Sequence, residues 1–303
     1  EPFWESPWGK GRPGWHIECT AMSIKHLAES FDIHGGGADL IFPHHENEIA
    51  QSEAFTGKPF VKYWVHNGFI TIDKEKMSKS LGNFFTIKEV LDRYDPEVVR
   101  FFLLSTHYRS PIEFSDEQLK EAEVSIDRYY TTLIRIADFP GKGDVKDKTS
   151  GIEKPFEGVV NSFKEKFQAA MDDDFNTALA LGHIFELIRE TNRFLDSSGS
   201  RVSDKPSGQK PSELISKAKE LLSEAGGVLN IFRRTPDEWQ SALMKSKKIK
   251  LTEQDVLNKI QEREEARQKK DWAASDVIRK ELDEKGIILE DKKDGTGWKI
   301  KVG

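Results

Sequence analysis

The chain has 303 residues, of which 32% are charged and 37% hydrophobic, and its formal net charge at pH 7 is −6. This composition is typical of a soluble globular protein with two or three domains. No run of about 18 apolar residues occurs, which excludes a membrane-spanning helix, and the acidic balance predicts no general affinity for nucleic acid.

Cys19 is the only cysteine, so the chain forms no internal disulfide and suits the reducing cytoplasm. Residues 1–15 lack the basic start and apolar core of a signal peptide. They also lack an initiator methionine and begin in mid-motif. We therefore expect a piece of a longer cytoplasmic protein that is monomeric and binds no membrane.

Residues 1–110 mix short apolar runs with Gly and Pro. Apolar residues flank Gly35-Gly36-Gly37, which predicts a strand followed by a loop. Further along, the pattern predicts a helix over 44–55, strand material over 61–72 and helices over 86–94 and 96–105. This alternation favours an α/β layer with a parallel sheet.

Long amphipathic helices follow in residues 111–245, which we expect to form a helical bundle. The candidate helices span residues 115–139, 157–171, 177–195 and 211–232. Ser115 with Gln118 fits a capping box. Residues 233–250 are expected to be a polar connection.

The last part, residues 246–303, reads as a small α/β module. Helices are predicted over 252–270 and 271–285, with Gly286 at a helix C-cap, followed by two short strands. This part carries 15 Lys+Arg against 13 Asp+Glu, a weakly basic balance that is compatible with polyanion binding and does not establish it.

Residues 32–51, DIHGGGADLIFPHHENEIAQ, concentrate potential ligands. His44 and Glu48 are four residues apart and so share one face of a helix. Together with Cys19 they offer imidazole, carboxylate and thiolate, which zinc accepts. Spacing alone leaves His45 open as the alternative to His44. It also leaves open a site without a metal, in which His44 caps the helix, Glu48 is solvated and Cys19 lies in the core.

Gly35, Gly36 and Gly37 would let a ligand approach the backbone closely because no Cβ intervenes, although a plain turn is the commoner use of such a run. Asp39 follows them and is placed to bind a ribose or an amino group.

The string Lys76-Met77-Ser78-Lys79-Ser80 is the strongest motif. The ammonium groups of Lys76 and Lys79 and the hydroxyls of Ser78 and Ser80 suit the triphosphate of ATP, whose oxygens gain negative charge as pyrophosphate departs. The same composition also fits a solvated turn.

KMSKS is a signature of class I aminoacyl-tRNA synthetases, and the chain resembles one of their families, the cysteinyl-tRNA synthetases. The strings that carry the resemblance are residues 14–19 (GWHIEC), 42–48 (FPHHENE), 76–85, 108–111 (YRSP), 172–177 (DDDFNT), 271–276 (DWAASD) and 295–298 (GTGW).

The resemblance implies that Cys19, His44 and Glu48 hold a zinc ion that binds the thiolate of the substrate L-cysteine, which separates it from serine better than shape can. It places Trp15 and His34 around the substrate side chain, and we expect Asp39 to bind the amino group of the substrate. Lys76 and Lys79 would contact Mg-ATP on a mobile loop. The products would be cysteinyl adenylate and then cysteinyl-tRNA-Cys. Residues 1–110 would be the C-terminal half of a Rossmann-type catalytic domain. Residues 111–245 would lie along the tRNA and 246–303 would read the anticodon, with Trp298 as a candidate for base stacking.

One departure matters. The family carries a HIGH signature and another zinc-ligating cysteine in an N-terminal half, and neither occurs in these 303 residues. We therefore predict that this polypeptide alone does not form the adenylate. Cysteine-dependent pyrophosphate exchange by the 303 residues alone would contradict this prediction.

Two alternatives remain. One is the related ligase that joins cysteine to an amino sugar in mycothiol synthesis, which does not need residues 246–303. The other is a non-catalytic tRNA-binding fragment or paralogue.

Overall fold

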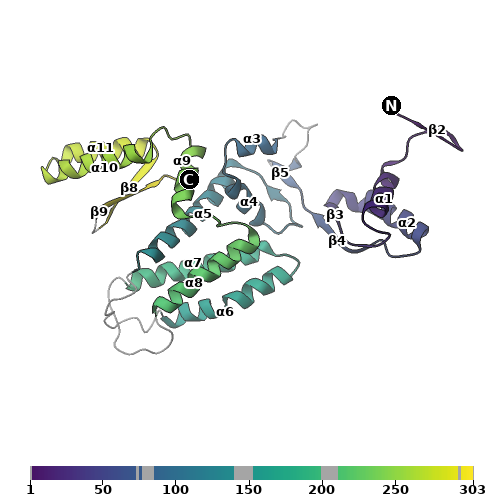
Figure 1. Cartoon of the computed structure of the whole chain (residues 1–303), viewed down its shortest axis with the longest axis horizontal. Coiled ribbons are helices and arrows are strands. Elements are labelled where there is room, and N and C mark those ends of the chain that lie inside the picture. The colour runs from purple at the N-terminus through teal and green to yellow at the C-terminus, as the bar shows by residue number, and fades with distance from the viewer. Residues whose placement is uncertain are drawn as a thin grey trace. The chain divides into compact units, whose positions relative to one another are not determined.

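The computed structural model describes residues 2–72, 75–76, 85–139, 153–198, 211–292 and 295–302 (Figure 1). Its contacts divide the chain into two compact units. The first unit comprises residues 1–83 and 106–113, and the second comprises residues 84–105 and 114–303. Among the described helices, none has the length and apolarity needed to cross a membrane. The division of the chain into domains at residues 110 and 245 stays a prediction.

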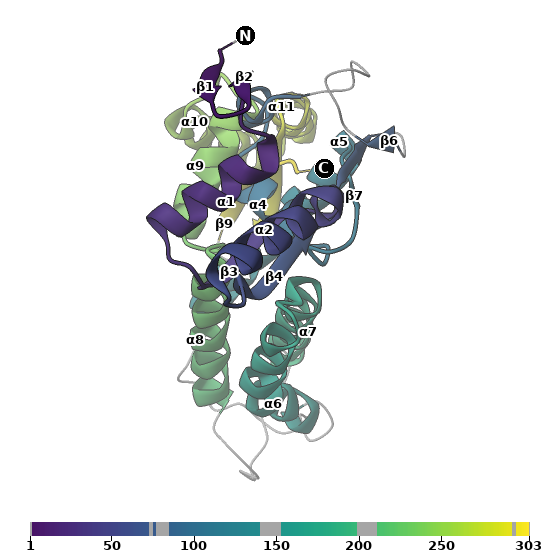
Figure 2. The same cartoon turned by 90° about the vertical axis from the view of Figure 1, so that its right-hand side faces the viewer.

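The first unit is an α/β layer built on parallel strand pairs. Its helices α1 and α2 contact each other beside the parallel pair β3 and β4 (Figure 2). The strand β5 pairs with β7 in parallel and with β6 in antiparallel orientation. The helices are α1 (Trp15–His26) and α2 (Glu46–Thr56), and the strands are β1 (Trp4–Ser6), β2 (Gly9–Gly11), β3 (Phe31–Gly37), β4 (Val61–Asn67), β5 (Ile70–Ile72), β6 (Glu75–Lys76) and β7 (Ile112–Glu113).

One local prediction for this unit was wrong and another was confirmed with a break. The three glycines are the end of strand β3 and not a loop after it. The strand material predicted over 61–72 is confirmed as β4 and β5. The two strands are separated at Gly68, whose N–H donates to the carbonyl of Tyr108 at 2.7 Å. A Cβ at Gly68 would overlap the carbonyl of Ser110, so only glycine fits where these two segments cross.

The helix predicted over 44–55 begins two residues later, at Glu46. A 3-10 turn (Ala38–Leu40) and a wider turn (Ile41–His45) lead into it and bury His44 and His45. Both histidines therefore precede α2, while Glu48 lies in its first turn.

The second unit is helical, with a small α/β module at its end. Helices α6, α7 and α8 pack on one another, and α5 contacts α4, α7 and α9 (Figure 1). The helices are α3 (Ile87–Leu91), α4 (Pro96–Leu104), α5 (Asp116–Ala137), α6 (Glu153–Asp172), α7 (Thr177–Ser198), α8 (Pro211–Leu229), α9 (Pro236–Ser246), α10 (Glu253–Gln268) and α11 (Trp272–Glu284), and the strands are β8 (Ile287–Lys292) and β9 (Gly295–Ile300).

Helix α9 corrects the prediction of a polar connection over 233–250. Thr235 and Glu238 form a capping box at its start and Pro236 occupies its first turn. Its apolar face buries Trp239 and Leu243 completely. At Ser115 the hydroxyl accepts from the Gln118 N–H, which forms one half of the expected capping box.

Buried polar contacts join α4 to the segment between α8 and α9. The Glu97 carboxylate accepts from the Tyr130 hydroxyl at 3.1 Å and from the Phe232 N–H. Arg234 lies 2.8 Å from Asp95 and 3.5 Å from Glu97. Burial raises the pKa of Glu97 above its ordinary value, although these partners lower it.

The C-terminal module has its own core. Val256 and Ile260 of α10, Leu282 of α11, and Ile287 and Leu289 of β8 are buried together. Gly286 adopts a φ of +82° just after α11, which agrees with the expected C-cap glycine.

Candidate functional site

The predicted ligands converge in the first unit from three elements. Helix α1 carries Cys19, the turn before α2 carries His44, and the first turn of α2 carries Glu48. One ligand atom from each lies within 4.8 Å of the other two. His44 is 4% exposed and Glu48 is fully buried.

Glu48 is the residue on which the site centres. The Nε2 atoms of His44 and His34 lie 2.6 and 3.2 Å from its two carboxylate oxygens. Neither contact has hydrogen-bond geometry, so both oxygens are buried without a hydrogen-bond partner. An unsatisfied buried carboxylate costs stability unless a cation compensates it. The thiol, imidazole and carboxylate around it are ligand types that zinc accepts, so the residues fit the metal.

A second group of possible ligands shares Glu48. His34, His45 and Glu48 also bring one ligand atom each within 4.8 Å of the others. The geometry therefore leaves both histidines of the pair beside the same carboxylate. Only the group with His44 contains the thiol.

Protonation in this site follows from burial. Burial raises the pKa of the Glu48 carboxyl, and burial, followed by the charge of Glu48, raises the pKa of the Cys19 thiol. Burial lowers the pKa of His44 and lowers that of His45 to about 4. The imidazoles are thus neutral at pH 7, the form that binds a metal, while a dication would restore the thiolate and carboxylate that burial disfavours.

The predicted substrate residues Trp15 and His34 lie around this group. The Trp15 ring stacks on His44 with 4.1 Å between centroids and 20° between planes, while half of Trp15 remains exposed. His16, one residue on, places its Nδ1 2.7 Å from the Nδ1 of His44. An aromatic wall therefore borders the candidate metal ligands on the α1 side.

Sequence reasoning missed Trp64 and His66 of β4. The register pairs His34 with Trp64 and Gly36 with His66. The Nε2 atom of His66 lies 2.9 Å from the Nδ1 atom of His45. Residues 64 and 66 are two positions apart, so their side chains lie on the same face of a strand. This spacing is the sequence signal that would have pointed to them.

The three glycines are packed against the chain's own atoms. A Cβ on Gly35 would lie 2.8 Å from the Val65 carbonyl oxygen, one on Gly36 would lie 3.0 Å from the His45 ring, and one on Gly37 would overlap the carboxylate of Asp39. The backbone oxygen beside Gly35 already requires glycine at that position, whereas the side chains beside Gly36 and Gly37 could shift. Close approach of a nucleotide stays a prediction. Asp39 is exposed in the turn after the glycines.

The ATP-binding motif falls mostly beyond what the structure describes. Lys76 is placed only as a residue of β6, opposite Thr71 of β5. Ser78, Lys79 and Ser80 lie outside the described residues.

The C-terminal module presents a different set of groups. Trp298 packs against its core, which makes it a poor candidate for base stacking, whereas Trp272 at the start of α11 is 59% exposed. Three arginines surround one carboxylate there: Arg263, Arg267 and Arg279 lie 2.7, 3.1 and 3.0 Å from Asp291.

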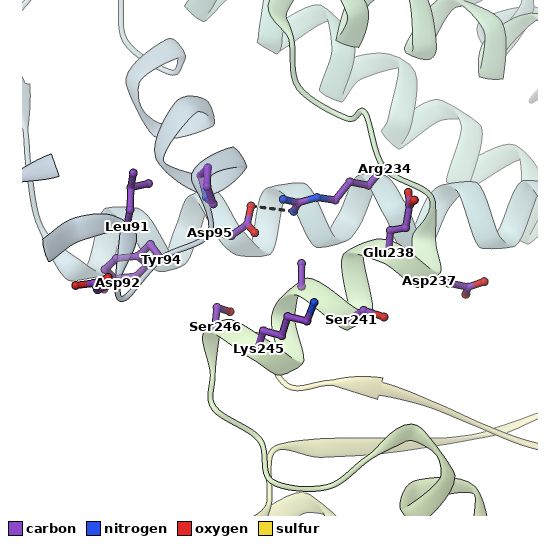
Figure 3. Close-up of a pocket in the computed structure, with 12 residues that line it drawn as sticks. Leu91, Asp92, Tyr94, Asp95, Arg234, Asp237, Glu238, Ser241, Lys245 and Ser246 are labelled. Carbon is purple, nitrogen blue, oxygen red and sulfur yellow. Dashed lines mark hydrogen bonds and ion pairs between the residues drawn. The ribbon is translucent and has the colours of Figure 1, made fainter. Parts of the chain in front are cut away.

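A cavity of about 730 Å³ lies in the second unit, between the α3–α4 junction and helix α9. Figure 3 shows Arg234 reaching toward Asp95 across one side and Lys245 of α9 on another. Its lining includes none of the predicted site residues, so it is separate from the candidate metal centre.

Three family models match the chain. The class I tRNA synthetase (C) catalytic domain matches residues 1–124, the DALR domain matches residues 166–233, and the cysteinyl-tRNA ligase anticodon-binding domain matches residues 258–298. A cysteine–tRNA ligase of Thermodesulfovibrio yellowstonii is 59% identical over 302 residues, covering 100% of this chain and 60% of that protein. One of Geobacter metallireducens is 52% identical, covering 99% and 61%.

The chain belongs to the cysteine–tRNA ligase family. It spans about 60% of the length of these cysteine–tRNA ligases. A solved structure described as an arginyl-tRNA synthetase of Campylobacter jejuni matches with a TM-score of 0.50 at 14% identity, over 74% of this chain and 52% of that one. That likeness concerns the fold alone, and it agrees with the α/β synthetase architecture predicted from the sequence.

Proposed function

We propose that this chain supplies the metal site, the ATP loop and the tRNA-reading parts of a cysteine–tRNA ligase. The enzyme would activate L-cysteine with Mg-ATP as cysteinyl adenylate and transfer the cysteine to tRNA-Cys in the cytoplasm. The observation that carries the proposal is the convergence of Cys19, His44 and Glu48 on one buried point in a chain of this family.

Cys19, His44 and Glu48 would hold zinc, which supplies a Lewis acid that binds a thiolate and leaves a serine hydroxyl unrecognised. We favour this set over the one with His45 because it includes the thiol. His45 would instead position its neighbours through its contact with His66.

The surrounding side chains orient the substrate. Trp15, stacked on His44, would cover the cysteine side chain and exclude water, and His34 would fix the Glu48 carboxylate from the opposite side. Asp39 would accept from the substrate ammonium group. Lys76, Ser78, Lys79 and Ser80 would contact the triphosphate and stabilise the charge that develops as pyrophosphate leaves.

Residues 258–298 favour the tRNA ligase over the mycothiol-type enzyme, because an enzyme with an amino-sugar acceptor does not need an anticodon-binding domain. The exposed ring of Trp272 is a better stacking platform for an anticodon base than Trp298. Binding of tRNA-Cys and other tRNAs, compared across salt concentrations, separates a specific reader from a merely charged surface.

Metal analysis tests the zinc site. We expect zinc in the wild-type chain and its loss in Cys19→Ala, with Met22→Ala as control because Met22 is on the same helix and 54% exposed. Equal zinc content in wild type and Cys19→Ala would refute the assignment.

The reaction is tested with the protein at its native length. Cysteine-dependent pyrophosphate exchange and charging of tRNA-Cys should both occur, and Lys79→Ala should slow exchange while leaving cysteine binding intact. Binding of tRNA without exchange would instead favour the non-catalytic alternative.

A further inference from the structure

Residues Tyr108 to Pro111 form a motif to which the proposed function assigns no role. They belong to the segment 106–113, which returns to the first unit after helix α4. Two backbone hydrogen bonds hold this segment: Gly68 N–H to the Tyr108 carbonyl at 2.7 Å, and Ile112 N–H to the Phe69 carbonyl at 2.9 Å. The close crossing at Gly68 fixes the turn directly after strand β4.

This position is the edge of the sheet where α/β proteins bind their ligands. Strands β3 and β4 run parallel and end opposite each other, at Gly37 and Asn67. Ligands of such sheets bind outside the carboxyl ends of the strands. The ring of Phe69 lies 3.8 Å from where a Cβ of Gly37 would be, so the chain after β4 remains beside the glycines of β3.

The same segment also adjoins the strand that carries Lys76. After the turn it continues into β7, which pairs with β5, and β5 pairs on its other side with β6. Thr71 of β5 is opposite Lys76 of β6. The turn thus joins the carboxyl end of β4 to the small sheet that leads into the ATP motif.

Arg109 occupies the tip of this turn. The turn closes with a hydrogen bond from the Ser110 N–H to the His107 carbonyl at 2.9 Å. The Arg109 guanidinium lies 5.2 Å from the centre of the Tyr108 ring, which itself stacks on His107 at 5.0 Å. The side chain is exposed, and the aromatic pair supports it from one side.

The positive charge of Arg109 reaches the candidate site. Burial and then the charge of Arg109 lower the pKa of His66, and His66 is the residue whose ring contacts His45. A guanidinium beside the strand ends presents a fork of N–H donors suited to phosphate oxygens.

We propose that Arg109 is a further phosphate-binding residue that contacts the triphosphate of ATP at the carboxyl end of β4. The proposal rests on the proposed function, since it adds a cation to the same nucleotide site. Tyr108 supports the guanidinium, and the backbone hydrogen bonds at the Gly68 crossing hold the turn from which the side chain extends.

Arg109→Ala and Arg109→Lys test this in the protein at its native length. In cysteine-dependent pyrophosphate exchange we expect Arg109→Ala to raise the KM for ATP about tenfold or more, the scale of a lost charge-assisted hydrogen bond. The KM for cysteine should change less than about twofold, and lysine should restore part of the loss because it keeps the charge without the fork.

Lys62→Ala is the matched control. Lys62 is likewise exposed and lies 5.3 Å from the centre of the neighbouring ring of Tyr63, but near the start of β4. It should leave both KM values unchanged. An unchanged KM for ATP in Arg109→Ala would overturn the proposal, as would equal rises for ATP and cysteine, which indicate a purely structural role.

Equilibrium binding of Mg-ATP, measured by calorimetry without cysteine, separates this inference from the proposed function. If the wild type binds Mg-ATP and Arg109→Ala weakens binding about tenfold, the inference stands even where exchange fails. If the wild type exchanges pyrophosphate normally but Arg109→Ala binds Mg-ATP as the wild type does, only the inference falls. If the wild type neither exchanges nor binds, both fall.

Discussion

Asp291→Asn should destabilise the C-terminal module more than any nearby surface change. Arg263 binds the Asp291 carboxylate through two nitrogens, at 2.7 and 3.0 Å. Arg263 is only 3% exposed and its Nε already has no hydrogen-bond partner. Removing the carboxylate charge would leave a buried guanidinium without compensation.

The magnitude follows from the exposure of the partners. Breaking a buried ion pair by removing one member costs about 3–5 kcal/mol. The Asp291 side chain is 35% exposed, so solvent screening reduces the expected loss to about 2–3 kcal/mol. Arg267 and Arg279 are 42% and 47% exposed and add little.

The loss should also depend on pH. Hydrogen bonds from Arg263 hold the pKa of Asp291 well below its ordinary value of 3.8. Because the folded pKa is depressed, the stabilisation is present above the unfolded value and is lost as pH falls through the folded one. The difference between wild type and Asp291→Asn should therefore be full near neutral pH and shrink below about pH 4.

Hydrogen exchange of β8 and β9, followed by mass spectrometry, measures the opening free energy of the module. Asp283→Asn is the control, because Asp283 pairs with Lys301 and both side chains are 51% exposed. That control should lose less than about 1 kcal/mol. If Asp291→Asn opened no more readily than Asp283→Asn, the reasoning from the buried guanidinium would be refuted.

Three further predictions concern the free energy of unfolding, each measurable by urea titration. Gly68→Ala should cost about 1–3 kcal/mol because its Cβ overlaps Ser110. The control Gly158→Ala lies inside α6, where a Cβ meets no atom within 4 Å, and should gain about 0.5–1 kcal/mol. Equal effects of the two substitutions would contradict the close crossing at Gly68. Thr235→Ala removes the capping box of α9 and should cost about 1 kcal/mol, and no loss would show that packing alone sets the start of α9. Burial raises the pKa of Glu97, so the stabilisation from the protonated carboxyl is present below about pH 4.5 and is lost as pH rises through the folded pKa. Glu97→Gln should lack this decline in stability. Parallel pH profiles of wild type and Glu97→Gln would contradict the prediction.

Much of the fold could be predicted because periodicity and caps are local signals. Thr177 and Pro211 begin helices where the sequence placed them. Helix α8 ends at Leu229, three residues earlier than expected, because Asn230 and Phe232 adopt positive φ values of 53° and 59°. Helix α9 was missed because its polar majority hid the two apolar residues that it buries, although Thr235 and Glu238 carried a capping signal.

The candidate site was only partly predictable. The i, i+4 spacing of His44 and Glu48 pointed to a shared face, and the structure brings Cys19 to it from another helix. The contact of His34 with the second oxygen of Glu48 depends on the register of a parallel strand pair, which sequence spacing does not encode. The break at Gly68 likewise depends on a crossing with residues some 40 positions later.

The return of residues 106–113 to the first unit has a consequence for biosynthesis. Strand β7 adds the third member of its sheet through Ile112, opposite Ile70, and the turn before it completes the crossing at Gly68. A ribosome must therefore translate α3 and α4, which belong to the other unit, before the first unit can close. Folding that proceeds from the N-terminus during synthesis cannot finish this α/β layer until residue 113 has left the exit tunnel.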